Sequence, residues 1–274
     1  MRPFLLVALL PAALCAAATL QIVKPVVSQS EGGDADAPGF EHIGGETIYY
    51  TCRIDGFAKS EDKVHLTYTA QAFDPRGVPL ANVDNNAILE QVSAQDKDWL
   101  PKIEGQVEIP PEVPAGEYKI LIKVKDYYAE DASAELPIAF RVKGTRVTLS
   151  DKLTLSNFGY YRAAEGGQPL TTAIFHNGST LYARWAMTGY KYGEGNKVDL
   201  NWTVSILGAD GKLLKAFDAA ADQSESAFYP KPWVEGEFEV PLQKVQSGAY
   251  VLQIKVKDAA GKQDLDSRHP FTVE

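Results

Sequence analysis

The chain has 274 residues and carries 36 acidic side chains against 27 lysines and arginines, a formal net charge of −9 at pH 7. Phosphate binding requires clustered basic residues, and here charges of both signs are spread along the sequence, so a nucleic-acid partner is not expected. The length suits two domains of about 100–150 residues, each large enough to fold around its own hydrophobic core.

Residues 1–18 have the pattern of a secretory signal peptide. Arg2 precedes an apolar run over residues 4–14, and small residues follow up to Ala18. The run is shorter than the roughly 20 apolar residues that a membrane-spanning helix needs. We therefore expect cleavage near Ala18, no transmembrane segment in the mature chain, and a secreted protein that is periplasmic or extracellular.

The rest of the sequence contains one pattern twice, over residues 19–150 and 151–274. Residues 116–126 (GEYKILIKVKD) and 248–258 (GAYVLQIKVKD) show it most clearly. Apolar and mostly polar residues alternate in both segments, which is the two-residue period of a half-buried β-strand, whereas a helix would scatter the apolar residues around its circumference. The sequence therefore predicts a tandem duplication with a half-buried strand at each segment.

Further segments align between the two copies. Each copy has about seven predicted strands, separated by turn signals at the spacing of a β-sandwich. The connection over residues 144–150 is too short for a flexible linker, which predicts a semi-rigid pair of domains with a modest interface. The other aligned pairs are 45–57 with 178–190, 64–72 with 198–206, 104–110 with 235–241, and 138–142 with 270–273.

Residues on the inward face of the first aligned strand exchange size between the copies. At neighbouring core positions, Tyr50 and Cys52 correspond to Ala183 and Trp185. The first copy has the large residue before the small one, and the second copy has the reverse order. The total side-chain volume is therefore expected to stay similar, which close-packed interiors tolerate. Cys52 is the one cysteine left after cleavage and faces the core, so we expect a buried, unreactive thiol with no intrachain disulfide.

Turns and variable loops complete each copy. Residues 74–77 (DPRG) and 208–211 (GADG) are expected to form solvated hairpin turns, and neither has the acidic pattern of a calcium loop. Loops carry binding more often than strands do, so four loop aromatics are candidates for contact with a glycan or a protein partner. Covering the end of a sandwich is nevertheless the use that their size favours. These residues are Trp99, Phe228, Tyr229 and Trp233.

Several short motifs together resemble a known family. They are Gly-x-x-Ile/Leu-Tyr, Glu-Gly-x-Val/Phe-Glu-Ile/Val-Pro, Gly-x-Tyr-x-Leu-x-Ile-Lys-Val-Lys-Asp and a closing Phe-x-Val. The chain resembles bacterial extracellular immunoglobulin-like repeats and, more loosely, the macroglobulin-type sandwiches of protease-trapping proteins. The resemblance implies an all-β fold of two tandem immunoglobulin-like antiparallel β-sandwiches after the signal peptide. Covalent trapping is not implied, because Cys52 lacks the Cys-Gly-Glu-Gln context of a macroglobulin thioester.

The sequence offers no convergent set of catalytic groups. Its four histidines do not form a convergent set, and the common nucleophile, zinc and phosphate-loop motifs are absent. We therefore expect no enzymatic activity, no catalytic residue, no metal site and no cofactor.

Three classes of binding function stay open. The first is a non-catalytic periplasmic or extracellular module that engages a protein or a cell-surface polymer, such as an envelope polysaccharide, through loops and sheet faces. The second is a carbohydrate-binding protein that uses the loop aromatics. The third is a periplasmic chaperone, because two immunoglobulin-like domains also form pilus chaperones, although those pair unlike domains around basic cleft residues.

Overall fold

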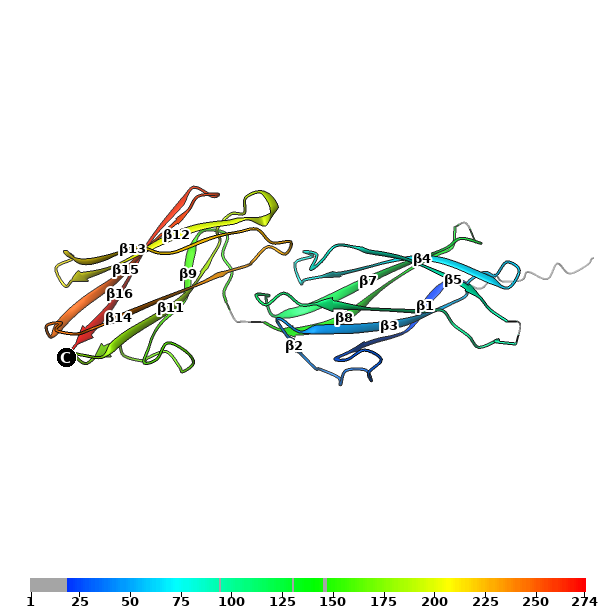
Figure 1. Cartoon of the computed structure of the whole chain (residues 1–274), viewed down its shortest axis with the longest axis horizontal. Coiled ribbons are helices and arrows are strands. Elements are labelled where there is room, and N and C mark those ends of the chain that lie inside the picture. Colours follow the sequence, from blue (N-terminus) through cyan, green and yellow to red (C-terminus); the bar gives the residue numbers. More distant parts are fainter. Residues whose placement is uncertain (1–18, 94, 130, 145–146) are drawn as a thin grey trace, which may run out of the picture.

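The computed structural model describes residues 19–93, 95–129, 131–144 and 147–274, and only the backbone of residues 218–225. The predicted signal peptide, 1–18, lies outside the described residues. Two β-sandwiches lie end to end along the long axis of the molecule (Figure 1). The all-β class predicted from the sequence is thereby confirmed. Within the described residues, no helix is long and apolar enough to cross a membrane.

The first sandwich packs a three-stranded sheet, in the order β1-β3-β6, against a five-stranded sheet, in the order β2-β8-β7-β4-β5. Neighbouring strands are antiparallel, except that the short β2 pairs with β8 in parallel. The strands are β1 (Gln21–Ser28), β2 (His42–Ile43), β3 (Thr47–Asp55), β4 (Lys63–Phe73), β5 (Asp84–Gln91), β6 (Lys102–Glu108), β7 (Gly116–Asp126) and β8 (Ser133–Lys143).

The second sandwich repeats this arrangement strand for strand. Its sheets have the orders β14-β11-β9 and β10-β16-β15-β12-β13, and β10 pairs with β16 in parallel. A 3-10 turn, η1 (Glu194–Asn196), precedes β12. The strands are β9 (Thr154–Tyr161), β10 (Ile174–Phe175), β11 (Thr180–Thr188), β12 (Val198–Gly208), β13 (Leu213–Glu225), β14 (Val234–Pro241), β15 (Gly248–Asp258) and β16 (Gln263–Val273).

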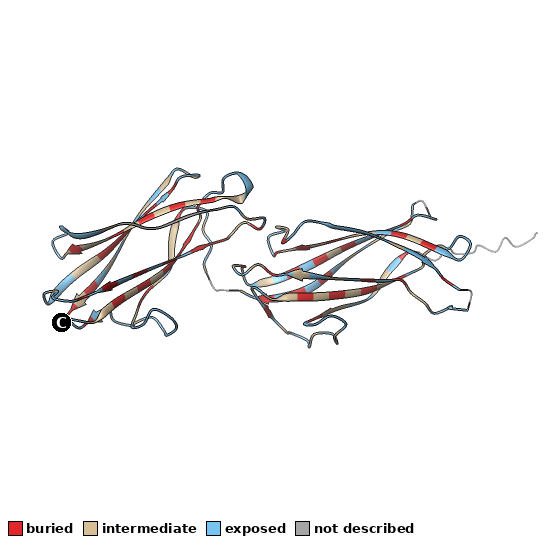
Figure 2. Cartoon of the chain, in the orientation of Figure 1, coloured by how far each residue is buried: buried red, intermediate tan, exposed pale blue. Residues whose placement is uncertain are grey.

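The duplicated segments form β7 and β15, each of which is the central strand of its five-stranded sheet. Alternate residues of β7 point into the core, and Tyr118, Ile120, Ile122 and Val124 are all at most 1% exposed. A similar alternation runs along β3, β8 and β14 (Figure 2), whereas β5 at the sheet edge is exposed along nearly its whole length. The predicted half-buried strands are therefore confirmed, because the face of each side chain follows from the two-residue period.

Both duplicated strands end in a buried aspartate with a structural role. Asp126 Oδ2 accepts a hydrogen bond from the Ala58 amide at 2.7 Å, and Asp258 Oδ2 accepts one from the Lys191 amide at 3.0 Å. The donors occupy equivalent places, two residues after an aligned glycine. Each aspartate thus ties the end of its strand to the loop that precedes β4 or β12, which explains why the repeated motif ends in Asp.

The size exchange between the copies is completed across paired strands. In β3 and β6, Tyr50 faces Gly105 and Cys52 faces Ile103. A side chain on Gly105 would collide with the Tyr50 ring. In this strand pair, the large Tyr50 therefore faces a glycine, and the small Cys52 faces an isoleucine.

The second sandwich reverses both pairs: Ala183 faces Phe238, and Trp185 faces Gly236. The sequence motifs aligned Gly105 with Gly236, but this alignment is wrong by two residues. In the structure, the residue equivalent to Gly105 is Phe238. A two-residue shift keeps every side chain on its original face, so the alternation pattern does not register it.

Candidate functional site

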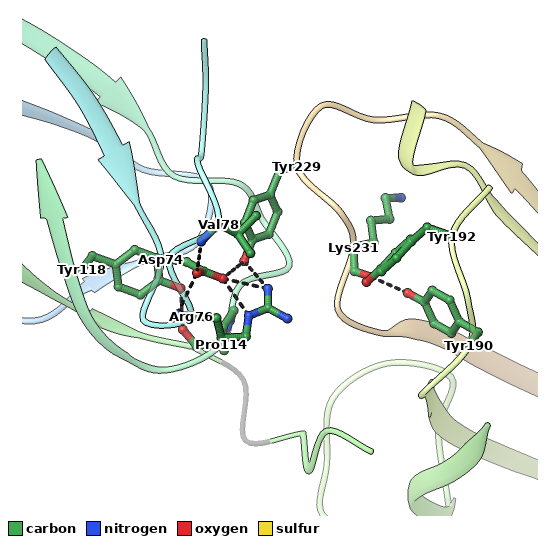
Figure 3. Close-up of polar contacts among 9 residues, drawn as sticks. All are labelled: Asp74, Arg76, Val78, Pro114, Tyr118, Tyr190, Tyr192, Tyr229 and Lys231. Atoms are coloured by element: carbon green, nitrogen blue, oxygen red, sulfur yellow. Dashed lines mark hydrogen bonds and ion pairs between the residues drawn. The ribbon is translucent and has the colours of Figure 1, made fainter. Parts of the chain in front are cut away.

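The two sandwiches meet where the turn after β4 approaches the loop that leads into β14 (Figure 3). The turn belongs to the first sandwich and the loop, 226–233, to the second. Polar contacts from both sides converge at this junction, and an open groove lies beside it. We take the junction as the candidate functional site, because it combines buried charge with an exposed apolar surface.

Asp74 is the centre of the junction. Its side chain is fully buried, and Oδ1 accepts hydrogen bonds from the amides of Arg76 and Val78, both at 2.8 Å. Oδ2 forms an ion pair with Arg76, with Nη2 at 2.7 Å and Nε at 2.8 Å. A buried carboxylate needs this many donors, because removing the charge from water is costly unless it is paired and hydrogen-bonded.

The prediction of a solvated turn is therefore wrong for Asp74. The counterpart in the second sandwich behaves as predicted: the Asp210 side chain is 56% exposed and accepts a hydrogen bond from the Lys212 amide at 3.0 Å. Asp74 differs from Asp210 because Tyr229 of the neighbouring sandwich packs over it, whereas Pro75, Arg76 and Gly77 of the same turn are exposed. Burial of Asp74 is thus completed by a tertiary contact and does not follow from the composition of the turn.

Tyr229 provides that cover. Its hydroxyl donates to Asp74 Oδ2 at 3.0 Å and accepts from Arg76 Nη2 at 3.1 Å. The residue is 6% exposed and packs with the hydrophobic core of the first sandwich, although it belongs to a loop of the second. Burial raises the pKa of the Tyr229 hydroxyl, the charge of Asp74 raises it further, and Arg76 opposes the rise. The hydroxyl therefore stays protonated and can donate.

Residues at the start of β7 also pack close to the turn that holds Asp74. The Tyr118 hydroxyl donates to the Pro114 carbonyl at 2.6 Å, and burial raises its pKa. Gly116, with φ at +153°, lies close to Pro75 of the turn, since a Cβ added there would come 2.7 Å from Pro75 Cγ. Because Gly116 has no side chain, the turn that holds Asp74 can pack against the first residue of β7.

The loop that carries Tyr229 is braced on the second sandwich. The hydroxyls of Tyr190 and Tyr192 both donate to the Lys231 carbonyl at 2.6 Å (Figure 3). The Asn196 side-chain amide donates to the Phe228 carbonyl at 2.7 Å. Prolines flank Lys231 at both sides and restrict its backbone. Tyr229 is therefore anchored to one sandwich by its backbone and to the other by its side chain.

A groove of about 620 Å³ lies beside this anchor. The first sandwich contributes Val78 and Pro79 to its lining, and the second contributes Phe228 and Pro230 among others. Phe228 is 48% exposed, so much of its ring is open to another molecule. The junction consequently presents an exposed aromatic side chain, Phe228, whose backbone carbonyl is hydrogen-bonded to Asn196.

The four aromatics predicted as ligand contacts have different environments. Trp99 packs edge-on against Phe57, with ring centroids 6.0 Å apart, and is partly buried against the first core. Trp233 is 2% exposed and Tyr229 is covered by the junction, so neither ring is open to a ligand in this structure. Of the four, Phe228 is the most exposed, at 48%. Ligand contact itself stays a prediction.

Sequence reasoning missed the polar half of the junction, which consists of Asp74, Arg76, Tyr190 and Tyr192. One signal was present: the turn has Pro and Arg after its aspartate in the first copy and lacks both in the second. A basic residue two positions from an acid is consistent with a local ion pair. Nothing in the local pattern points to Tyr229 as its third member, since the contact spans 155 residues.

The reactive residue types lie apart from the junction. Cys52 is 1% exposed, as predicted, and burial raises the pKa of its thiol to about 12. His269 stacks on Phe158 with ring centroids 3.4 Å apart, and burial lowers its pKa to about 4. Across the described ranges, no three or more His, Cys, Asp or Glu side chains gather in a group that could hold a metal ion.

Comparisons with known proteins do not assign this chain to a family. No family model matches the sequence, and no curated protein matches it. Among solved structures, the chain is similar to the Pseudomonas fluorescens alkylpurine DNA glycosylase AlkC bound to DNA containing an abasic site analog. That match has a TM-score of 0.30 and 12% identity, and it covers 45% of this chain and 30% of that one.

A second similar structure is red sea bream transglutaminase, with a TM-score of 0.27 and 7% identity over 92% of this chain and 31% of that one. The chain therefore spans about a third of the length of either protein. Similarity at this level carries no argument about activity or partners.

Proposed function

We propose that this protein is a non-catalytic, secreted module that binds a protein or a cell-surface polymer in the bacterial envelope or outside the cell. Its domains would be residues 19–150 and 151–274, both immunoglobulin-like, after a signal peptide over residues 1–18. The strand order of each sandwich supports the immunoglobulin-like assignment, since a three-stranded and a larger sheet with this connectivity are typical of that architecture.

One observation carries the proposal: Phe228 is exposed in a groove to which both sandwiches contribute. Exposed aromatic side chains in a fixed position are typical of binding surfaces, because they supply apolar contact at little cost in conformational entropy. The anchor at Tyr229 holds the groove together, so a partner would not have to order the two sandwiches before binding. Such pre-organisation favours affinity.

The experiment compares the mature protein with Phe228→Ser on immobilised envelope fractions, one treated with protease and the other depleted of polysaccharide. We expect saturable retention of the mature protein by one of the two fractions and at least tenfold weaker retention of Phe228→Ser by that fraction. Retention by the protease-treated fraction indicates a polymer partner, and retention by the polysaccharide-depleted fraction indicates a protein partner. Tyr127→Ser is the matched control, since Tyr127 is 66% exposed and outside the groove. Equal retention of all three proteins, or no saturable retention, would remove the support for this proposal.

A further inference from the structure

The end of the second sandwich that points away from the junction carries an exposed apolar surface. It lies beside the C-terminus at one extreme of the molecule (Figure 1) and consists of the turn between β12 and β13, the start of β13, and the loop between β14 and β15. Leu213 and Leu214 are 61% and 57% exposed there. Leu214 borders a hollow of about 360 Å³ whose walls include Leu242, Tyr250 and Phe271. We name this surface the tail.

The tail is the counterpart of the end of the first sandwich that takes part in the junction. The turn 208–211 closes with a hydrogen bond of 2.9 Å from its last amide to its first carbonyl, as the turn 74–77 does. Tyr250 and Tyr118 each donate to the carbonyl four residues earlier, at 2.7 and 2.6 Å. The two ends therefore have the same local structure, and the one in the first sandwich receives Tyr229 from its neighbour.

Equivalent apolar residues are less covered in the tail. Leu80 and Leu214 both lie three residues after the glycine of the turn, and they are 5% and 57% exposed. Tyr118 is 1% exposed, whereas Tyr250 is half-buried. In the first sandwich, Tyr229 of the neighbouring sandwich forms part of the hydrophobic core. The tail thus leaves an apolar surface open at the place where the first sandwich receives its neighbour.

The opposite extreme of the molecule is the free end of the first sandwich, which we name the head. It is formed by the loops that follow β3, β5 and β7. These loops are joined, because Phe57 packs edge-on against Trp99 and the Ala58 amide donates to Asp126 at the end of β7. The head is the counterpart of the end of the second sandwich that makes the junction, since Tyr229 follows β13 as Trp99 follows β5.

The head presents exposed aromatic rings. Tyr127 and Tyr128 are 66% and 37% exposed and meet edge to face. The Tyr127 ring also stacks on the His65 ring, with centroids 4.4 Å apart. A supported, exposed tyrosine supplies apolar contact area at little cost in conformational entropy. The head therefore carries aromatic rings, and the tail has an open apolar hollow.

The two free ends also differ in charge. The described residues of the three head loops include two exposed lysines, Lys59 and Lys97, and five exposed acids. These acids are Glu61, Asp62, Asp96, Asp98 and Asp131. The exposed charges of the tail are Lys212, Lys215 and Lys244 against Asp210 and the adjoining Glu274. A head and a tail therefore attract each other, whereas two heads or two tails repel.

We propose that the tail of one molecule binds the head of a second copy of this chain. Tyr127 of one molecule enters the hollow beside Leu214 of the next, and the acidic loops of the head face the lysines of the tail. Because each molecule has one head and one tail, this heterologous contact repeats along a row and does not close at two molecules. The row continues between molecules the end-to-end order that the two sandwiches have within one.

The test follows the mass of the mature chain by sedimentation velocity from micromolar to millimolar concentration. The parent protein is expected to form dimers and then longer rows, and added salt should weaken this association because it screens the charges of the two ends. Leu214→Glu blocks the tail and Tyr127→Ser blocks the head, and each variant alone is expected to self-associate at least tenfold more weakly. An equal mixture of the two should form a one-to-one complex and nothing larger, because one free head and one free tail remain.

Val83→Glu is the matched control, since Val83 is 45% exposed and lies outside the head and the tail. It should associate as the parent does, and circular dichroism checks that every variant is folded. A parent protein that stays monomeric at millimolar concentration would overturn the proposal, as would a mixture of the two folded variants that forms no complex. Neither variant alters the groove at Phe228, so retention by envelope fractions, measured at dilution, tests the proposed function separately.

Discussion

Removing one hydroxyl from the junction should loosen the two sandwiches relative to each other. In Tyr229→Phe the ring stays, but Asp74 Oδ2 loses a donor at 3.0 Å and Arg76 Nη2 loses an acceptor at 3.1 Å. A hydrogen bond to a charged group contributes about 1.5–3 kcal/mol. The Asp74–Arg76 pair itself survives, so the loss should stay below the roughly 3–5 kcal/mol that follows when a buried pair is broken.

Two measurements test the effect of Tyr229→Phe, namely the distance between the two sandwiches and the thermal stability. Spin labels on cysteines introduced at Leu89 and Leu213, which are 69% and 61% exposed in different sandwiches, report the distance between them by pulsed electron resonance. We expect one narrow distance distribution in the parent protein and a broad one in Tyr229→Phe. Thermal unfolding should also begin earlier, since each kcal/mol shifts the midpoint by about 2–4 °C in a chain of this size.

Tyr250→Phe is the matched control. It removes a tyrosine hydroxyl that donates to the Gln246 carbonyl at 2.7 Å within the second sandwich, where the bond is exposed to solvent. It should leave the distance distribution unchanged. If Tyr229→Phe also leaves both the distribution and the unfolding curve unchanged, the hydroxyl does not fasten the junction and our reasoning about its buried hydrogen bonds is wrong.

Three further predictions concern the cores. Gly236→Ala should lower the free energy of unfolding by about 1–3 kcal/mol in urea titrations, because the added methyl group meets the Trp185 ring. His269 has a pKa of about 4 in the folded chain, against an ordinary value of 6.5. The unfolded chain therefore binds more protons between these two pH values, and the free energy of unfolding should fall as the pH falls through that range. The difference in the free energy of unfolding between pH 4.5 and pH 7.5 should be smaller in His269→Gln than in the parent protein. Cys52 should resist iodoacetamide at pH 8 in the folded protein and react fully in urea, since burial raises its thiol pKa to about 12; rapid labelling of the native protein would contradict its placement.

The sequence by itself determined the strands, their inward faces and the duplication. Residues 116–126 and 248–258 alternate with a period of two, and a strand with that pattern has one face that must be buried whatever lies opposite. The burial of Cys52 follows from the same register. Local patterns suffice here because the direction of a side chain depends on its own strand.

Only the tertiary structure decided which residues meet. The two-residue displacement of β14 leaves every side chain on its face, so no pattern in the sequence could reveal that Trp185, and not Ala183, lies opposite Gly236. Likewise, a turn with Asp74 and Arg76 is compatible with solvent until Tyr229, 155 residues later, covers it. A buried charge is stable only where all its partners arrive together, and that condition depends on the packing of two domains and not on the composition of one turn.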